Sequence, residues 1–249
     1  MTPPRRLIAG NWKMHGLDAA LAEARLLGAI MDERPPACRV ALCPPATLIR
    51  PMTDLLAGSS ILVGGQDCHP RPSGAFTGDI SAEMLADAGA ALVIVGHSER
   101  RLGHGEDDGL VGLKAAAAIR GGLEPIVCVG ESHGQHLAGD ALRIVTGQIR
   151  GSLPGELRGR DFAVAYEPVW AIGTGLTPSS AEIEEVHGAI RDTLLSMFGA
   201  DGGAAPILYG GSVKPANARE ILKLREVGGA LVGGASLKAT EFAAICGAV

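Results

Sequence analysis

The chain has 249 residues, of which 47% are hydrophobic and 20% are charged, and its formal net charge at pH 7 is -5. This length and composition suit one α/β domain with a large buried core. The acidic balance and the lack of any Lys/Arg run exclude the basic surface that a nucleic acid or an anionic membrane requires, so the sequence favours a small-molecule ligand.

The first residues and the cysteines indicate a cellular compartment. The start, MTPPRRLIAGNW, lacks the apolar core and small-residue cleavage site of a secretory signal, and no run reaches the roughly 18 apolar residues of a membrane helix. The five cysteines are scattered and form no C-x-x-C pair, so neither a disulfide framework nor a zinc site is predicted. We expect a cytoplasmic protein with reduced thiols and no metal.

Short apolar runs alternate with segments of helical periodicity along the whole chain. The clearest helical segments are 17–31 and 183–197, where apolar residues recur every three or four positions. Strands that are apolar almost throughout, each followed by a helix, form parallel sheets covered on both faces. Eight such units predict an α/β fold in which residues 1–249 form a single (β/α)8 barrel, with eight parallel strands surrounded by helices. The expected strands are 7–10, 40–43, 61–64, 91–95, 125–129, 162–166, 207–209 and 230–232.

Polar residues follow three of the expected strands. Asn11 and Lys13 come after the first strand, His97 after the fourth and Glu167 after the sixth. In a barrel these positions converge on the face where such enzymes carry out their chemistry. Each residue also has a plainer interpretation: Lys13 as a solvated side chain, His97 as a core or capping residue, and Glu167 as a loop acid. Their joint occurrence at strand ends favours an active site.

The segment after the sixth strand predicts a lid. In YEPVWAIGTGLTP, residues 166–178, a carboxylate precedes a loop of small residues, and the glycines and threonine of 173–175 can change backbone angles cheaply. Ser179 and Glu182 have the spacing of a capping box that begins the next helix. An ordinary connection is the alternative.

Glycine-rich turns follow the last two expected strands. The strings YGGSV and VGGASL expose the backbone amides of Ser212, Gly233 and Gly234, and a helical segment comes after each string. Turn N–H groups and helix N-termini bind anions, and phosphate is the anion that suits this place in a barrel. The alternative is that these glycines only form tight turns.

Together these residues suit a proton transfer next to a carbonyl group. Glu167 can abstract the proton, His97 can donate to the resulting oxyanion, and Lys13 can stabilise a negatively charged intermediate. The sequence contains no cluster of metal ligands beside them, so we expect no cofactor.

Six strings of residues occur in an order and at a spacing that identify a family. They are AGNWKM at 9–14, GAFTGD at 74–79, VGHSERR at 95–101, YEPVWAIGTG at 166–175, YGGSV at 209–213 and LVGGASL at 231–237. With them the chain resembles the triosephosphate isomerase family over essentially its full length. The resemblance implies a TIM barrel and an intramolecular aldose–ketose isomerase. Such an enzyme interconverts dihydroxyacetone phosphate and D-glyceraldehyde 3-phosphate through an enediolate, in glycolysis and gluconeogenesis.

The resemblance also implies a role for each site residue. Glu167 would move the proton between the two carbons, and neutral His97 would polarise and protonate the oxygens. Asn11 and Lys13 would bind the substrate and assist electrostatically. The phosphate would be held by four backbone amides, those of Gly173, Ser212, Gly233 and Gly234.

Glu99 resembles a supporting acid of the family. The alternative is a structural carboxylate in a salt bridge with Arg100.

The segment 67–79 is too long and too rich in Gly and Pro for a simple connection between a strand and a helix. In the family this loop inserts into a second subunit. The resemblance therefore implies a homodimer formed through the 67–79 loop, with Phe76 and Thr77 at its tip. A surface loop that contacts no partner is the alternative.

Leu176 and Pro178 depart from the family, which commonly has lysine and alanine there. Proline fixes one backbone angle, so the departure bears on the rate of lid closure.

Two other functions remain open. One is isomerisation of a four-carbon ketose phosphate. The string AGNWKM and the complete lid sequence favour the smaller, three-carbon substrate. The other is a non-catalytic barrel that serves as a binding or scaffold protein. Lys13, His97 and Glu167 at one mouth weigh against it, because a scaffold does not need a cation, an acid and a base together.

Overall fold

Parallel strands close into a barrel in the computed structural model, which describes residues 6–172 and 176–249. The strands follow one another around the barrel in chain order, and β1 closes it by pairing with both β2 and β8. The predicted (β/α)8 fold is confirmed, and each predicted strand end lies within one residue of the observed one. The strands are β1 Leu7–Asn11, β2 Arg39–Cys43, β3 Ile61–Gly65, β4 Leu92–Val95, β5 Glu124–Val129, β6 Ala163–Tyr166, β7 Ile207–Tyr209 and β8 Gly229–Val232.

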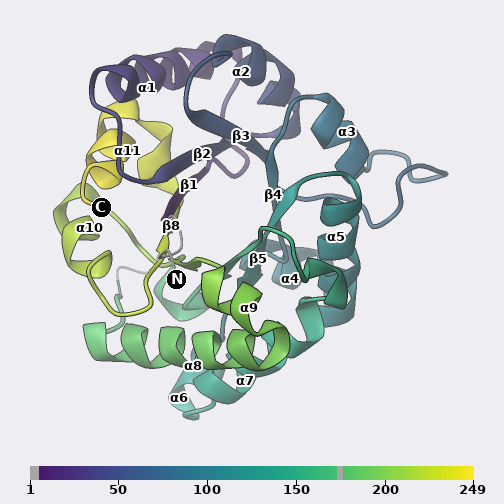
Figure 1. The fold of residues 1–249 in the computed structure, drawn as a ribbon, viewed down its shortest axis with the longest axis vertical. Coiled ribbons are helices and arrows are strands. Elements are labelled where there is room, and N and C mark those ends of the chain that lie inside the picture. The colour runs from purple at the N-terminus through teal and green to yellow at the C-terminus, as the bar shows by residue number, and fades with distance from the viewer. Residues whose placement is uncertain (1–5, 173–175) are drawn as a thin grey trace.

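Helices surround the strands on the outside of the barrel (Figure 1). Because each helix returns the chain to the next parallel strand, the carboxyl ends of all strands meet at one face. The α-helices are α1 Leu21–Glu33, α2 Ile49–Leu55, α3 Ala82–Asp87, α4 Ser98–His104, α5 Asp108–Arg120, α6 His133–Leu137, α7 Ala141–Ser152, α8 Ser180–Phe198, α9 Ala200–Ala204, α10 Pro215–Ile221 and α11 Ala239–Cys246. Short 3-10 turns are η1 Asp18–Ala20, η2 Ala46–Leu48, η3 Gly155–Leu157, η4 Val169–Ala171 and η5 Gly234–Leu237.

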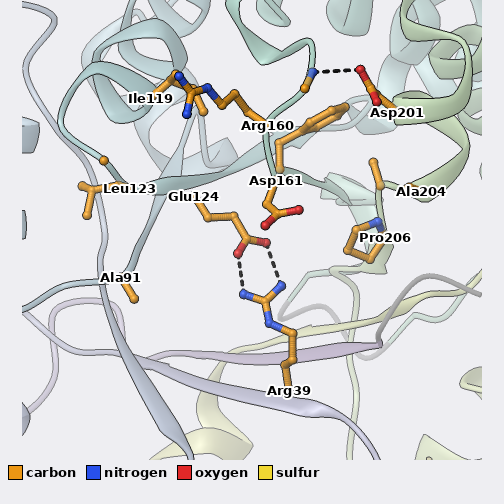
Figure 2. Close-up of a pocket in the computed structure, with 14 residues that line it drawn as sticks. Arg39, Ala91, Ile119, Leu123, Glu124, Arg160, Asp161, Asp201, Ala204 and Pro206 are labelled. Carbon is orange, nitrogen blue, oxygen red and sulfur yellow. Dashed lines mark hydrogen bonds and ion pairs between the residues drawn. The ribbon is translucent and has the colours of Figure 1, made fainter. Parts of the chain in front are cut away.

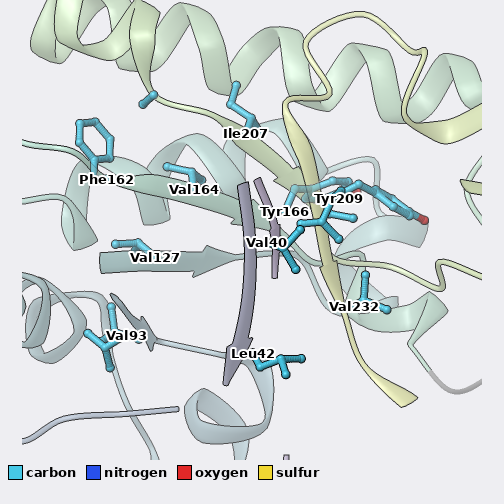
Figure 3. Packing of buried hydrophobic residues seen from close by; sticks show 14 of the residues in the cluster. Val40, Leu42, Val93, Val127, Phe162, Val164, Tyr166, Ile207, Tyr209 and Val232 are labelled. Atoms are coloured by element: carbon cyan, nitrogen blue, oxygen red, sulfur yellow. The ribbon is translucent and has the colours of Figure 1, made fainter. Parts of the chain in front are cut away.

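The core has two layers because alternate residues of a strand face opposite sides. Inside the barrel the side chains are small or medium-sized, as at Ala9, and they form one cluster. The intervening residues, such as Ile8, pack outward against the helices in a second, larger cluster. Figure 3 shows side chains of the outer cluster, including Val127, Val164 and Ile207, on neighbouring strands. Strands buried on both sides explain the nearly continuous apolar runs in the sequence.

One predicted helical segment starts later than expected. Leu17 precedes η1 and is 83% exposed, so its assignment to the apolar face of the first helix is wrong. The reason is that α1 begins only at Leu21, and its buried face starts at Ala24 and Leu27. The other segment, 183–197, lies within α8 as predicted.

The connection between β3 and α3 extends away from the barrel (Figure 1). At its base the amide of His69 donates to the carbonyl oxygen of Ile80 at 2.8 Å. Further out, the rings of His69 and Phe76 lie 4.0 Å apart, and Thr77 is exposed. The segment is therefore a loop with its own internal contacts. Among the described residues, no helix has the length and apolar character needed to cross a membrane.

Candidate active site

Glu167 follows β6 and has its carboxylate inside the mouth of the barrel. The side chain is 1% exposed, and its backbone amide donates to the carbonyl oxygen of Val129 on β5 at 2.8 Å. Its carboxylate accepts hydrogen bonds from the amide of Ser98 at 2.9 Å and from the Ser98 hydroxyl at 3.2 Å. His97 Nε2 lies 2.9 Å from Glu167 Oε1. The ends of β4 and β6 thus bring the predicted base and the predicted acid into contact.

His97 is the N-cap residue of α4. Its Nδ1 accepts a hydrogen bond from the amide of Glu99 at 3.3 Å, so the capping role foreseen for this residue is real. That bond leaves the lone pair on Nδ1 and places the proton of a neutral ring on Nε2, the nitrogen that faces Glu167. The cap therefore fixes the tautomer in which Nε2 is a hydrogen-bond donor.

Burial and charge oppose each other at this pair. Burial disfavours the imidazolium form of His97, but the adjacent Glu167 carboxylate outweighs burial and raises the pKa of the imidazole above its ordinary value. Burial likewise disfavours the Glu167 carboxylate, but His97 and the hydrogen bonds from Ser98 outweigh it and lower the pKa of the carboxyl group. Glu167 is thus ionised and ready to accept a proton.

Lys13 follows β1 and lines the same mouth, in a strained backbone conformation. Its φ is 52°, in the left-handed region that L-residues other than Asn and Asp rarely adopt. The conformation is stabilised because Asn11 Oδ1 accepts from the Lys13 amide at 2.9 Å and Gln66 Nε2 donates to the Lys13 carbonyl oxygen at 2.8 Å. Backbone strain of this kind is concentrated at functional sites.

Glu99 pairs with Lys13 and not with Arg100. Lys13 Nζ and Glu99 Oε1 are 2.5 Å apart. The Arg100 guanidinium instead contacts Asp67 at 3.0 Å and Glu106 at 2.7 Å. The suggested salt bridge of Glu99 with Arg100 is therefore absent from the described contacts, and Glu99 instead contacts the predicted cation.

A cavity of about 460 Å³ joins these residues to the turns after β7 and β8. A Cβ atom added at Gly233 would lie 3.7 Å from Lys13 Cε, and one added at Gly210 would lie 2.9 Å from Glu167 Cγ. The turns therefore approach the ammonium group and the base closely. The cavity is lined by Asn11, Lys13, His97, Glu167, Ile172, Gly210, Gly211, Ser212, Val213, Lys214, Pro215, Leu231, Gly233, Gly234, Ala235 and Glu241.

The two turns have backbones fixed by hydrogen bonds to their carbonyl oxygens. Asn217 Nδ2 donates to the carbonyl oxygen of Ser212 at 3.0 Å, and the Ser236 amide donates to that of Gly233 at 2.8 Å. Gly234 begins η5, and the first N–H groups of a helical turn have no acceptor within it. Such a turn can bind an anion.

The predicted lid is described only at its two ends. Gly173, the expected phosphate ligand of this segment, lies outside the described residues. On one side Trp170 Nε1 donates to Glu131 Oε1 at 2.6 Å. On the other, Pro178 is buried, and Ser179 and Glu182 form the capping box that begins α8, as predicted.

Three residues of the site were missed by the sequence analysis. Ser98 binds the base, Gln66 holds the Lys13 backbone, and Glu131 is fully buried and accepts from the Tyr166 hydroxyl at 3.1 Å. Gln66 follows β3 directly, and Glu131 is the second residue after β5. Applying the strand-end rule to those two strands would have found them.

A larger cavity, of about 930 Å³, lies at the opposite end of the barrel, where the strands begin (Figure 2). Its central charges neutralise each other, since the Arg39 guanidinium pairs with the Glu124 carboxylate through two hydrogen bonds. Asp201 accepts from the Gly159 amide at 2.8 Å. The predicted base, acid and cation line the other mouth.

Comparisons with known proteins show the family of the chain. The family model described as triosephosphate isomerase matches residues 6–249. A triosephosphate isomerase of Caulobacter vibrioides is 60% identical over 244 residues, which cover 98% of this chain and 96% of the relative. A triosephosphate isomerase of Xanthobacter flavus is 54% identical over 250 residues, and the match covers 100% of this chain and 100% of the relative. The crystal structure of triosephosphate isomerase from Bartonella henselae has a TM-score of 0.92 and 45% identity, and the match covers 98% of each chain.

Proposed function

The chain belongs to the triosephosphate isomerase family, and on this premise we propose how its residues perform the reaction. It is an intramolecular aldose–ketose isomerase that interconverts dihydroxyacetone phosphate and D-glyceraldehyde 3-phosphate by proton transfer through an enediolate, a step of glycolysis and gluconeogenesis. The observation that carries the assignment of roles is the 2.9 Å contact between His97 and Glu167 in a cavity shared with two glycine-rich turns.

Glu167 is the base that moves the proton. In the ligand-free chain its carboxylate is held by Ser98 and His97, so the substrate must replace these contacts before the proton is taken. A carboxylate that is buried and already ionised abstracts a proton from the carbon next to the carbonyl and returns it to the neighbouring carbon. The enediolate forms where water is excluded, which strengthens each electrostatic contact with it.

His97 and Lys13 stabilise the charge that develops on the substrate oxygens. Once substrate replaces the contact with Glu167, burial favours the neutral His97 ring. Its Nε2–H group then donates to the oxygen atoms, and its Nδ1 stays an acceptor of the Glu99 amide. Lys13, placed by Asn11 and Gln66, supplies the positive charge for both the intermediate and the phosphate. Base, acid and cation are all side chains, so the proposed reaction uses neither a metal nor a cofactor.

The phosphate is bound by backbone amides at the ends of β7 and β8. We assign this role to Ser212, Gly233 and Gly234, because their turns line the same cavity as the base. The proposal adds the amide of Gly173 as a fourth phosphate ligand, and only the family resemblance supports this addition. Residues 1–249 act as one barrel domain.

We further propose a cytoplasmic homodimer formed through the 67–79 loop. Met14 is 94% exposed and Leu17 is 83% exposed, and both follow Lys13 closely in the chain. Large exposed apolar side chains next to a site mark an interaction surface, and the loop of a second copy is the proposed partner. The net charge of -5 favours neither a nucleic acid nor a membrane as a further partner.

The assignment is tested with a coupled assay of the purified protein on D-glyceraldehyde 3-phosphate and on a four-carbon ketose phosphate. We expect kcat/KM to be far higher for the three-carbon substrate. A higher value for the larger sugar would transfer the assignment to that substrate, and no turnover of either would support the scaffold alternative.

The dimer is tested by sedimentation of the wild type and of Thr77→Arg. A bulky charge at the exposed tip of the loop should produce monomers, while Ser196→Arg, at an exposed position of α8, controls for the added charge. Identical sedimentation of the wild type and Thr77→Arg would remove the loop from the interface.

A further inference from the structure

Two cysteines that are far apart in the sequence meet at the end of the barrel opposite the active site. Cys38 directly precedes β2, and Cys246 is the last residue of α11. The Sγ atom of Cys38 lies 3.8 Å from the carbonyl oxygen of Cys246, across 208 positions of sequence. In a barrel the helices run antiparallel to the strands. The start of a strand and the end of a helix therefore lie at the same face, which brings these two positions together.

The two thiols differ in exposure and in acidity. A hydrogen bond from the Cys246 side chain, distinct from the contact with the Cys246 carbonyl oxygen, lowers the pKa of Cys38 despite partial burial, and the positive charge of Arg6 acts in the same direction. Cys246 is 1% exposed, and the same hydrogen bond together with burial raises its pKa. Cys38 is only half-buried. A half-buried thiol with a lowered pKa beside a cation has the properties of a reactive cysteine.

The other three cysteines lack these properties. Cys43, Cys68 and Cys128 are buried, and burial raises the pKa of Cys43 and of Cys68 to about 12 and also raises that of Cys128. Inert buried thiols of this kind are structural. Of the five cysteines, Cys38 is therefore the one suited to react first.

A cavity beside the pair reaches Cys246 and Ala37, the residue before Cys38. A cavity of about 590 Å³ lies beside the carboxyl end of α11, and Cys246 is among the residues that line it. Arg34, Pro35, Pro36 and Ala37 lie on its other side, immediately before Cys38 in the chain. The cavity contains neither the base nor the phosphate turns of the active site.

We propose that Cys38 and Cys246 are a redox-active thiol pair that a peroxide converts to an intramolecular disulfide. The Cys38 thiolate attacks one oxygen of the peroxide; an S–O bond forms, the O–O bond breaks, and the leaving oxygen takes up a proton. The Cys246 sulfur then attacks Cys38 Sγ; the S–S bond forms, the S–O bond breaks, and the departing hydroxide leaves as water with the Cys246 proton. The pair gives two electrons to the peroxide, and a dithiol reductant reverses the oxidation.

The disulfide connects the start of β2 to the end of α11. It closes a loop of almost the whole chain, and such cross-links stabilise mainly by restricting the unfolded chain. The cross-link lies at the opposite end of the barrel from Glu167. Oxidation is therefore expected to raise the thermal unfolding midpoint and to leave kcat within about twofold, since the base and the phosphate turns lie at the other end of the barrel.

Treatment of the full-length protein with hydrogen peroxide, followed by mass spectrometry of a non-reduced digest, tests this proposal. We expect a peptide that joins Cys38 to Cys246, the loss of two of the five free thiols, and recovery of both with dithiothreitol. Cys68→Ala is the matched control, because it removes another buried cysteine and should keep the cross-link.

Variants of the pair separate the two steps. Cys38→Ser should show no loss of thiols at the same peroxide dose. Cys246→Ala should accumulate sulfenic acid at Cys38, which dimedone traps. The proposal is overturned if the wild type forms no Cys38–Cys246 peptide, if it forms only disulfides between two chains, or if Cys43, Cys68 or Cys128 is oxidised before Cys38.

Discussion

Burial disfavours the charged forms of Glu167 and His97, but the charge of each group stabilises the charged form of the other. The Glu167 carboxylate is almost fully buried, yet its pKa lies below the ordinary value because His97 and Ser98 interact with its charged form. These contacts are present in the ligand-free protein. The ligand-free state thus keeps the base ionised, and substrate binding exchanges its partners.

The first prediction concerns the protonation of His97. In the wild type the Glu167 carboxylate outweighs burial, so the ring should titrate above its ordinary value of 6.5. In Glu167→Gln the negative charge is gone and burial remains, so the midpoint should fall below 6.5. NMR titration of the His97 ring measures both values. Equal midpoints in the two proteins would mean that the carboxylate does not control the charge of the ring.

The carboxyl ends of β5 and β6 lie so close together that they fix the position of the Glu167 carboxylate. A Cβ atom at Gly130, just after β5, would lie 1.8 Å from the carbonyl oxygen of Glu167. That distance is far inside van der Waals contact, so only glycine allows β5 and β6 to end side by side in this way. The position of the carboxylate is thus set by a residue with no side chain.

Gly130→Ala should therefore displace Glu167 and lower kcat by about 100-fold, the usual cost of moving a catalytic group by about 1 Å. Gly134→Ala is the control, because an added Cβ there meets nothing within 4 Å and alanine favours its helix. Steady-state kinetics of the two variants measure the difference. A normal kcat in Gly130→Ala would show that the strand ends do not fix the base.

Pro178 is buried and directly precedes the capping box of α8, so it constrains the end of the lid. We predict that Pro178→Ala changes kcat several-fold and the inhibition constant of a rigid phosphate analogue much less, because a gate affects a rate more than the affinity of the closed state. Pro154→Ala, a proline that precedes η3 outside the lid, is the control. Equal effects of Pro178→Ala on both constants would argue against a gating role.

For the molecule as a whole, barrel closure brings together residues that the sequence separates. The strands and the residues at their ends could be predicted because period, length and chain order determine which positions face the mouth. Gln66 and Glu131 follow the same rule, because they come after the ends of β3 and β5. The 2.9 Å contact of His97 with Glu167 and the pairing of Cys38 with Cys246 could not be predicted, since each depends on side-chain geometry across the closed barrel.

Leu17 shows a further limit of the sequence pattern. Its spacing matches the apolar face of α1, but the side chain is 83% exposed. Periodicity identifies apolar positions without identifying what covers them, and a surface for a second copy of the chain looks the same as a core position.

The stability of the whole molecule should depend on pH through His187. This side chain of α8 is completely buried, and burial lowers its pKa to about 4, while the unfolded chain takes up the proton near 6.5. The unfolded state therefore binds a proton that the folded state does not, and stability present above pH 6.5 is lost as the pH falls towards 4.

Between pH 7 and 4.5 this site alone should reduce the free energy of unfolding by about 2–3 kcal/mol. Urea unfolding at the two pH values should show a smaller difference for His187→Gln than for the wild type. His104→Gln, at an exposed position, should behave like the wild type. If His187→Gln kept the full pH dependence, another group would have to account for it.

The central claim is that one carboxylate, placed by β6 in a mouth shared with His97 and the phosphate turns, carries the reaction. The most direct test is kcat of Glu167→Asp on D-glyceraldehyde 3-phosphate, with circular dichroism to verify the fold. Removing one methylene withdraws the carboxylate by about 1 Å, so kcat should fall by about 100-fold or more while the spectrum stays the same. A folded variant that turns over at the wild-type rate would contradict the account.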